Sequence, residues 1–197
     1  MPKVSEEHRI ARRTEIAQAA MRCFARKGFD GTSVADIIAE SGLSAGAIYG
    51  HYKSKNELIQ LAVSELLGQR MAEVEIALQR EELMEPGELI GVFLRGVERE
   101  FVDLSVLLQL WAAAATDAGL RGVADSIAGS IRNVFQTYLA AWHVRSTGLS
   151  EAEAEARATR EAWVYIGICQ GYMVQSTIFE AFDGDAYIET SAALLAR

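Results

Sequence analysis

Apolar residues recur with the spacing of α-helices along almost the whole chain. In the first such segment, residues 8–27, they fall on one face at i, i+3, i+4 and i+7 intervals, at Ile10, Ala17, Ala20, Met21 and Phe24. The pattern predicts a long helix over 56–82 and, after a break at 84–87, further helices over 87–102, 104–118, 120–146, 150–181 and 184–196. No strand-like alternation competes with it, so we predict an all-α fold of about nine helices.

Three helix starts lie close together between Gly31 and Leu58. The pairs Ser33/Asp36 and Ser54/Glu57 have the spacing of capping boxes, in which each side chain bonds a backbone N–H of the other residue. Ser44 can cap a short helix in between, and Gly42 can end the preceding one in the left-handed conformation. Two short helices joined by such a turn can present one helix to the DNA major groove, although the same turn also occurs in ordinary helical hairpins.

The charge is distributed unevenly. The chain of 197 residues has a net charge of −8, but residues 1–60 carry nine Lys/Arg and seven Asp/Glu, which gives +2, against −10 for the rest. All four lysines, Lys3, Lys27, Lys53 and Lys55, lie in the first 55 positions. This distribution is what we expect of a small module that faces a polyanion and is attached to an acidic body.

The remaining composition favours a cytoplasmic protein without a cofactor. The charged N-terminus has no apolar leader, and the longest nearly apolar stretch, 106–115, is shorter than the roughly 20 residues that span a bilayer. Cys23 and Cys169 are far apart and have no CxxC spacing, which favours two buried thiols over a disulfide or a zinc site. There is no phosphate loop, H-E-x-x-H or G-x-S-x-G motif. We therefore expect no catalytic residue, no metal and no membrane partner.

The segment G-T-S-V-x-D-I-x-x-x-S-G-L-S-x-G-x-I-Y-x-H-Y-x-S-K-x-E-L resembles the DNA-binding domain of the TetR family of bacterial transcriptional repressors almost position for position. The resemblance covers about residues 8–62. It implies a helix-turn-helix DNA-binding domain at 1–55 and an effector-binding and dimerisation domain at 56–197. It also implies a ligand-responsive homodimer on a pseudo-palindromic double-stranded operator.

The short helix from Ala45 to about Tyr52 is expected to divide by face, with Ile48 and Tyr52 inward. Small outward residues let the backbone approach base edges, and alanine methyls can meet a thymine methyl. Ala45 and Gly50 stand where similar repressors often carry larger polar side chains, so few side-chain hydrogen bonds to bases are expected. The predicted DNA contacts are Thr32, Ser33, Ser44, Ala45, Gly46, Ala47, Tyr49, His51, Lys53 and Lys55.

The later helices suggest a ligand site and a dimer interface. Their aromatic residues, which include all three tryptophans, lie among a few neutral polar groups, a composition typical of an apolar small-molecule site and also of a solid core. The predicted ligand-binding residues are Phe93, Val97, Phe101, Leu108, Trp111, Asn133, Trp142, Trp163, Gln170 and Met173. The resemblance implies that the last two helices form the dimer, through Trp163, Gly167, Gly171, Val174, Ile178 and Leu194.

Overall fold

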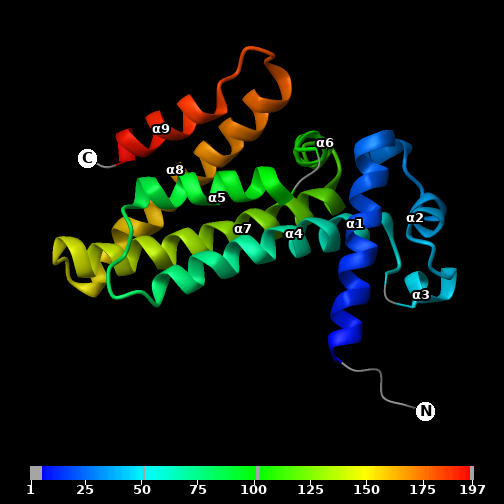
Figure 1. The fold of residues 1–197 in the computed structure, drawn as a ribbon, viewed down its shortest axis with the longest axis horizontal. Helices are drawn as coiled ribbons and strands as arrows, with labels where there is room; N and C mark the ends of the chain where they lie inside the picture. The colour runs from blue at the N-terminus through cyan, green and yellow to red at the C-terminus, as the bar shows by residue number, and fades with distance from the viewer. Residues whose placement is uncertain (1–5, 51, 101–102, 196–197) are drawn as a thin grey trace. The chain divides into compact units, whose positions relative to one another are not determined.

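The computed structural model describes residues 6–50, 52–100 and 103–195, and within them it consists of helices and connecting turns (Figure 1). The α-helices in these ranges are α1 (Glu6–Gly31), α2 (Val34–Ser41), α3 (Ala45–Tyr49), α4 (Lys55–Leu78), α5 (Pro86–Glu100), α6 (Ser105–Ala114), α7 (Ala118–Trp142), α8 (Glu151–Ile178) and α9 (Gly184–Leu195). A π-helical turn, His143–Thr147, follows α7. The prediction of an all-α fold with about nine helices is confirmed. Among the described helices, none has both the length and the apolar content needed to cross a membrane.

The helix boundaries differ from the predicted ones by a few residues, for local reasons. Helix α1 continues past the expected end at Lys27 to Gly31, with a kink at Gly28, whose φ is 72°. Helix α4 ends at Leu78 rather than near residue 82. Pro86 opens α5 instead of preceding it, because proline needs no backbone hydrogen-bond partner in the first turn of a helix and its fixed φ suits that position.

The chain folds into two compact units. Unit 1 comprises residues up to Leu67 together with Ser105–Ala124, and unit 2 comprises Gly68–Leu104 together with the residues from Asp125 onward. Helices α4 and α7 therefore contribute residues to both units. The predicted boundary at residues 55 and 56 divides the chain by function rather than by packing, and it stays a prediction.

Unit 1 is built around α1, which contacts both α2 and α6. Its apolar face is fully buried at Ile16, Ala20 and Phe24, and Ile37 of α2 completes the same core. Helix α6 is tied to the end of α1 because the side-chain oxygen of Gln109 accepts a hydrogen bond of 2.8 Å from the backbone N–H of Phe29.

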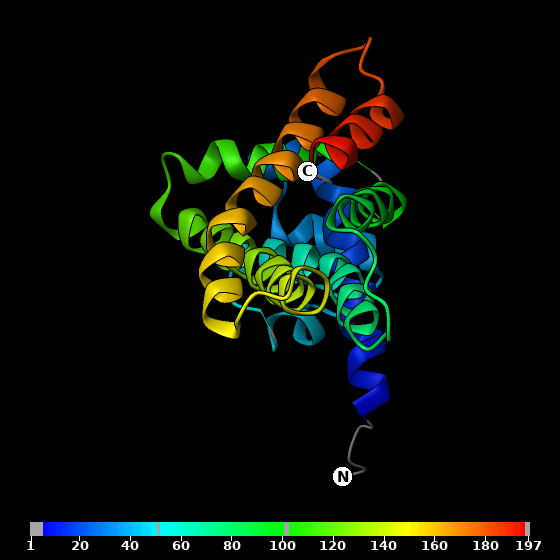
Figure 2. The same ribbon diagram turned by 90° about the vertical axis from the view of Figure 1, so that its left-hand side faces the viewer.

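Unit 2 has an aromatic core covered by α8 and α9, which run side by side in both views (Figures 1 and 2). The rings of Phe93 and Phe135 meet edge to face with centroids 5.1 Å apart, and Phe135 lies 5.2 Å from Tyr165. The hydroxyl of Tyr138 donates a hydrogen bond of 3.0 Å to the carbonyl of Met84 and so fixes the turn before α5. Ring packing of this kind occupies the centre of the unit.

The turn between α2 and α3 supplies a stability prediction. Gly42 has φ 68°, where a side chain costs roughly 1–2 kcal/mol. We expect Gly42→Ala to destabilise the protein by about 1 kcal/mol in urea unfolding, because the smaller entropy of the unfolded alanine chain offsets only part of that cost. Gly122→Ala is the matched control, since Gly122 lies in the unit 1 part of α7 with no heavy atom within 4 Å of the added Cβ. It should stabilise by roughly 0.5–1 kcal/mol. Shifts of the same sign in both variants would contradict the prediction.

Candidate nucleic-acid interface

Helices α2 and α3 begin at the caps expected from the sequence. The Ser33 hydroxyl accepts a hydrogen bond of 3.2 Å from the Asp36 backbone N–H, and the Asp36 carboxylate accepts one of 2.8 Å from the Ser33 N–H. Gly42 ends α2 in the left-handed conformation. The Ser44 hydroxyl then accepts from the Ala47 N–H at 3.2 Å and caps α3. These short-range bonds set the direction in which α3 leaves the turn.

The two faces of α3 differ as predicted. Ile48 is fully buried and anchors the helix to the rest of unit 1. The opposite face consists of small groups, with Ala45 and Gly46 exposed and Ala47 half-buried. Tyr49, at 54% exposure, is the large side chain on this face, and Ser33, Ser44 and Lys53 are exposed beside it. The backbone of α3 is therefore accessible to a large partner.

Ion pairs hold α2 against α1. Glu40 accepts hydrogen bonds from Arg26 at 2.5 Å and from Arg22 at 2.7 Å, and these bonds lower the pKa of its carboxyl to about 2. Lys27 donates to Asp36 at 2.6 Å, which, with the bonds from Ser33, holds the pKa of Asp36 well below its usual range. Three basic side chains of α1 are thus paired with two acidic side chains of α2.

Thr32 and Lys55 have partners within the chain, and their contact with DNA stays a prediction. Thr32 is 2% exposed, and its hydroxyl lies 2.7 Å from the carbonyl oxygen of Gly28 and 3.1 Å from that of Cys23. The Lys55 ammonium donates to the carbonyl of Phe29 at 2.8 Å and lies 4.3 Å from the centre of its ring. Both side chains thus bond backbone carbonyls of α1. His51, also predicted to contact DNA, lies outside the described residues.

The predicted ligand-binding residues belong to different units. Leu108 and Trp111 belong to α6 in unit 1, whereas the other described members lie in unit 2. Phe101 lies outside the described residues. Periodicity identified which side chains face inward, but it could not tell which helices are neighbours.

Within unit 2 the members of that set also differ in environment. Phe93, Val97 and Met173 are core residues, Trp142 and Gln170 are half-buried, and Asn133 and Trp163 are exposed. A cavity of about 210 Å³ beside α4 and α5 is lined by Phe93 but by no other residue of the predicted set. The common ligand site of these side chains stays a prediction.

Helices α8 and α9 present apolar side chains to solvent. Trp163, Ile178 and Leu194 are each more than half exposed. Val164 on α8 and Phe179 just after its end are also exposed, although neither was among the residues predicted for the interface. A hollow of about 740 Å³ with mostly apolar walls lies between α8 and α9, with Val164 and Leu194 among its lining residues.

The remaining residues predicted for the dimer interface differ in position. Gly167 is exposed and Val174 is half-buried. Gly171 makes room for α9 of the same chain, because a Cβ there would lie 2.6 Å from the Tyr187 hydroxyl oxygen. The close helix approach expected at Gly171 is thus a contact inside the chain.

The capped pair α2–α3, braced by α1, is a helix-turn-helix of the DNA-binding type. Residues 16–62 match the family described as "Bacterial regulatory proteins, tetR family". Residues 16–62 thus resemble the DNA-binding segment of this family. Over 74 residues it is 43% identical to an HTH-type transcriptional repressor of Mycobacterium tuberculosis, an alignment that covers 38% of this chain and 39% of that relative. The chain thus matches well under half the length of this relative.

Solved structures extend the likeness in fold to nearly the whole chain. A TetR-family transcriptional regulator from Syntrophomonas wolfei aligns with a TM-score of 0.72 at 16% identity, covering 93% of this chain and 92% of that one. A transcriptional regulator from Aquifex aeolicus aligns with a TM-score of 0.68 at 21% identity, over 93% and 97% of the two chains. At these identities the likeness establishes the fold of the C-terminal helices.

The ion pairs of Glu40 give a pH-dependent prediction. Because the folded-state pKa of Glu40, about 2, lies below the ordinary glutamate value of 4.5, the stabilisation by Glu40 is complete above pH 4.5 and is lost as the pH falls toward 2. We expect Glu40→Gln to lower the urea midpoint at pH 7 and this difference from wild type to shrink between pH 4.5 and pH 2. Glu189→Gln, at an exposed position of α9, is the control and should leave the midpoint at pH 7 unchanged. A difference for Glu40→Gln that did not vary with pH would contradict this assignment.

Proposed function

We propose that the protein is a transcriptional repressor that binds a pseudo-palindromic DNA operator as a homodimer and presents α3 of each subunit to the major groove. The observation that carries this proposal is the division of α3 into a buried anchor, Ile48, and an exposed face of small side chains. A face without bulky side chains allows the helix backbone to approach the edges of the bases.

Readout of the bases by this helix would be limited. Ala45 and Ala47 can offer methyl contacts to thymine, but neither side chain can form a hydrogen bond with a base. Tyr49 and Lys53 are exposed and can donate to phosphate oxygens, which fixes the position of the protein without reading the sequence. Part of the specificity would therefore come from the shape and deformability of the operator.

A dimer is part of the proposal because α3 has only five residues. Two-fold dimers of helix-turn-helix proteins bind half-sites about one turn of DNA, roughly 34 Å, apart. The exposed apolar side chains of α8 and α9 offer a self-complementary surface for such a dimer, since monomeric proteins rarely expose large apolar patches. We propose that these two helices pair with their counterparts in a four-helix bundle.

Release from DNA by an apolar or aromatic small molecule completes the proposal. Helix α4 contributes Lys55–Leu67 to unit 1 and residues from Gly68 to unit 2, so it links the two units covalently as a single element. A ligand that binds unit 2 and favours one arrangement of α4 over another would shift the population able to bind DNA.

A ligand-independent regulator of the same fold is the second candidate. The ring contacts of Phe93, Phe135 and Tyr165 favour it, because they fill the centre of unit 2 with protein side chains. A thermal-shift screen combined with DNA binding separates the two candidates. An effector must both stabilise the protein and weaken its complex with DNA, and a screen of apolar compounds without such a case would favour the second candidate.

Binding to DNA from upstream of the protein's own gene tests the central proposal. We expect nanomolar to micromolar binding by fluorescence anisotropy, with an affinity that falls steeply as salt rises. Replacing Tyr49 and Lys53 together by alanine should weaken binding by about tenfold or more and reduce the salt slope by about 1, because Lys53 is the one cation that is lost. Arg160→Ala, which removes an exposed charge from α8, should leave both unchanged. Full affinity in the double variant would count against α3 as the DNA-binding element.

The dimer has its own test. Ile178→Asp places a charge in the exposed apolar surface of α8, and we expect it to convert a dimer into monomers in sedimentation velocity. The matched control is Ile76→Asp on α4, where the side chain is 65% exposed and outside the proposed interface. A wild-type protein that sediments as a monomer, or equal effects of the two variants, would argue against the proposed interface.

A further inference from the structure

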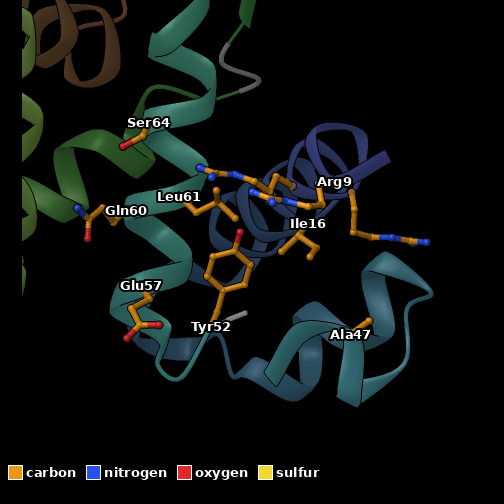
Figure 3. A pocket seen from close by; sticks show the side chains of 10 residues that line it. Arg9, Ile16, Ala47, Tyr52, Glu57, Gln60, Leu61 and Ser64 are labelled. Atoms are coloured by element: carbon orange, nitrogen blue, oxygen red, sulfur yellow. The ribbon is translucent and has the colours of Figure 1, made fainter. Parts of the chain in front are cut away.

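Unit 1 contains a hollow of about 720 Å³ beside the recognition helix (Figure 3). It lies between the first turns of α1, the helix α3 and the beginning of α4. Its lining residues are Arg9, Arg12, Arg13, Ile16, Ala47, Tyr52, Glu57, Gln60, Leu61 and Ser64. The volume is within the range of small-molecule sites, about 300–1,000 Å³. Three arginine side chains therefore line a hollow next to α3. They do not belong to the face of α3 that is proposed to meet the bases, so they indicate a different contact.

The arginines reach the hollow because of their spacing. Arg9, Arg12, Arg13 and Ile16 occupy positions i, i+3, i+4 and i+7, which form one face of a helix. The aromatic ring of Tyr52 points into the space between Ile16 and Leu61 (Figure 3). The hollow therefore combines an apolar floor with a row of guanidinium groups, and Ala47 connects it to the exposed part of α3.

The arginines of the hollow have different partners from those farther along α1. Arg12 pairs with Glu15 at 3.0 Å and Arg13 with Glu65 at 2.9 Å, and in each pair the arginine is at least one-third exposed. Ion pairs at such exposure are weak, and a planar guanidinium can exchange a carboxylate for a phosphate, which it binds in two-pronged geometry. Arg22 and Arg26 are about as exposed, but they differ from Arg12 and Arg13 in that both bond the same carboxylate, Glu40 of α2.

Tyr52 adds a neutral donor to the same space. Burial raises the pKa of its hydroxyl, which therefore keeps its proton at neutral pH. A protonated hydroxyl can donate to a phosphate oxygen without adding charge. Gln60 and Ser64 supply further neutral polar groups on the α4 side of the hollow.

We propose that this hollow binds a phosphate group of the DNA backbone at the edge of α3, with Arg12 and Arg13 as the main donors and Arg9 beside them. The inference rests on the proposed DNA binding and gives it a second point of contact. It also adds donors to those predicted from the sequence, among which Thr32 and Lys55 bond carbonyls of α1. A phosphate in the hollow would fix the register of α3 along the groove without reading the bases.

The test compares the salt dependence of DNA binding in variants with equal loss of charge. Arg12→Ala/Arg13→Ala should weaken binding by about ten- to a hundredfold and lower the slope of log K against log salt by about 1–2. The loss should be equal on operator and unrelated DNA, because a backbone contact carries no sequence information. The control is Arg157→Ala/Arg160→Ala on α8, where Arg157 pairs with Glu161 as Arg13 pairs with Glu65. It should bind with the wild-type slope.

Other outcomes overturn the inference in distinguishable ways. If wild type binds DNA and the Arg12/Arg13 variant keeps the wild-type slope, or loses affinity for the operator only, the phosphate contact is wrong and the proposed function stands. If wild type binds no DNA, both are wrong. Saturable binding of pyrophosphate or ATP in calorimetry, lost in the variant, would identify a site for a free phosphorylated ligand instead. Arg12→Lys/Arg13→Lys retains the charge and should keep most of the slope, which separates loss of contact from loss of folding.

Discussion

A helix of five residues has no stability of its own, because the cost of nucleating a helix exceeds what a single turn of hydrogen bonds returns. Helix α3 is held by one buried side chain, Ile48, and by the Ser44 cap at its start. Helix α3 contacts α2, and Phe24 of α1 and Ile37 of α2 are fully buried in the same unit as Ile48. The outward face of α3 is thereby left with small residues that are not needed for packing.

The same constraint determines how unit 1 uses its positive charge. Fixing α2 on α1 requires ion pairs, and Arg22, Arg26 and Lys27 meet that need. Near the end of α1, the Lys55 ammonium donates a hydrogen bond to the carbonyl of Phe29. Arg9, Arg12 and Arg13 in the first turns of α1 line the hollow, and Arg12 and Arg13 also pair with Glu15 and Glu65. A net charge of +2 over residues 1–60 therefore understates how unevenly the positive charge is distributed.

Local features of this fold could be predicted from the sequence, and features that join distant segments could not. The caps at Ser33, Ser44 and Gly42 involve residues within three positions of each other, and the structure confirms them. The contact of Gln109 with Phe29 joins residues 80 positions apart, and nothing in the helical period indicates it. For the same reason the predicted ligand residues are divided between two units. The helical period shows that an aromatic side chain faces inward, but it does not show whether that side chain packs in the core of unit 1 or of unit 2.

The chemistry of α3 makes the remaining helices necessary to the proposed function. A protein that binds DNA mainly through phosphates has non-specific dissociation constants of about 10⁻⁴–10⁻⁶ M at physiological salt, whereas specific regulators reach about 10⁻⁸–10⁻¹¹ M. Methyl contacts from Ala45 and Ala47 are too few to close that gap from one half-site. Joining two half-sites makes the second binding event intramolecular, which raises the overall affinity without any new kind of contact. The exposed apolar side chains of α8 and α9, with Trp163 and Ile178 among them, are the surface from which that joining can be built. Because the small residues of α3 form few contacts with bases, specific binding depends on a stable dimer formed through α8 and α9.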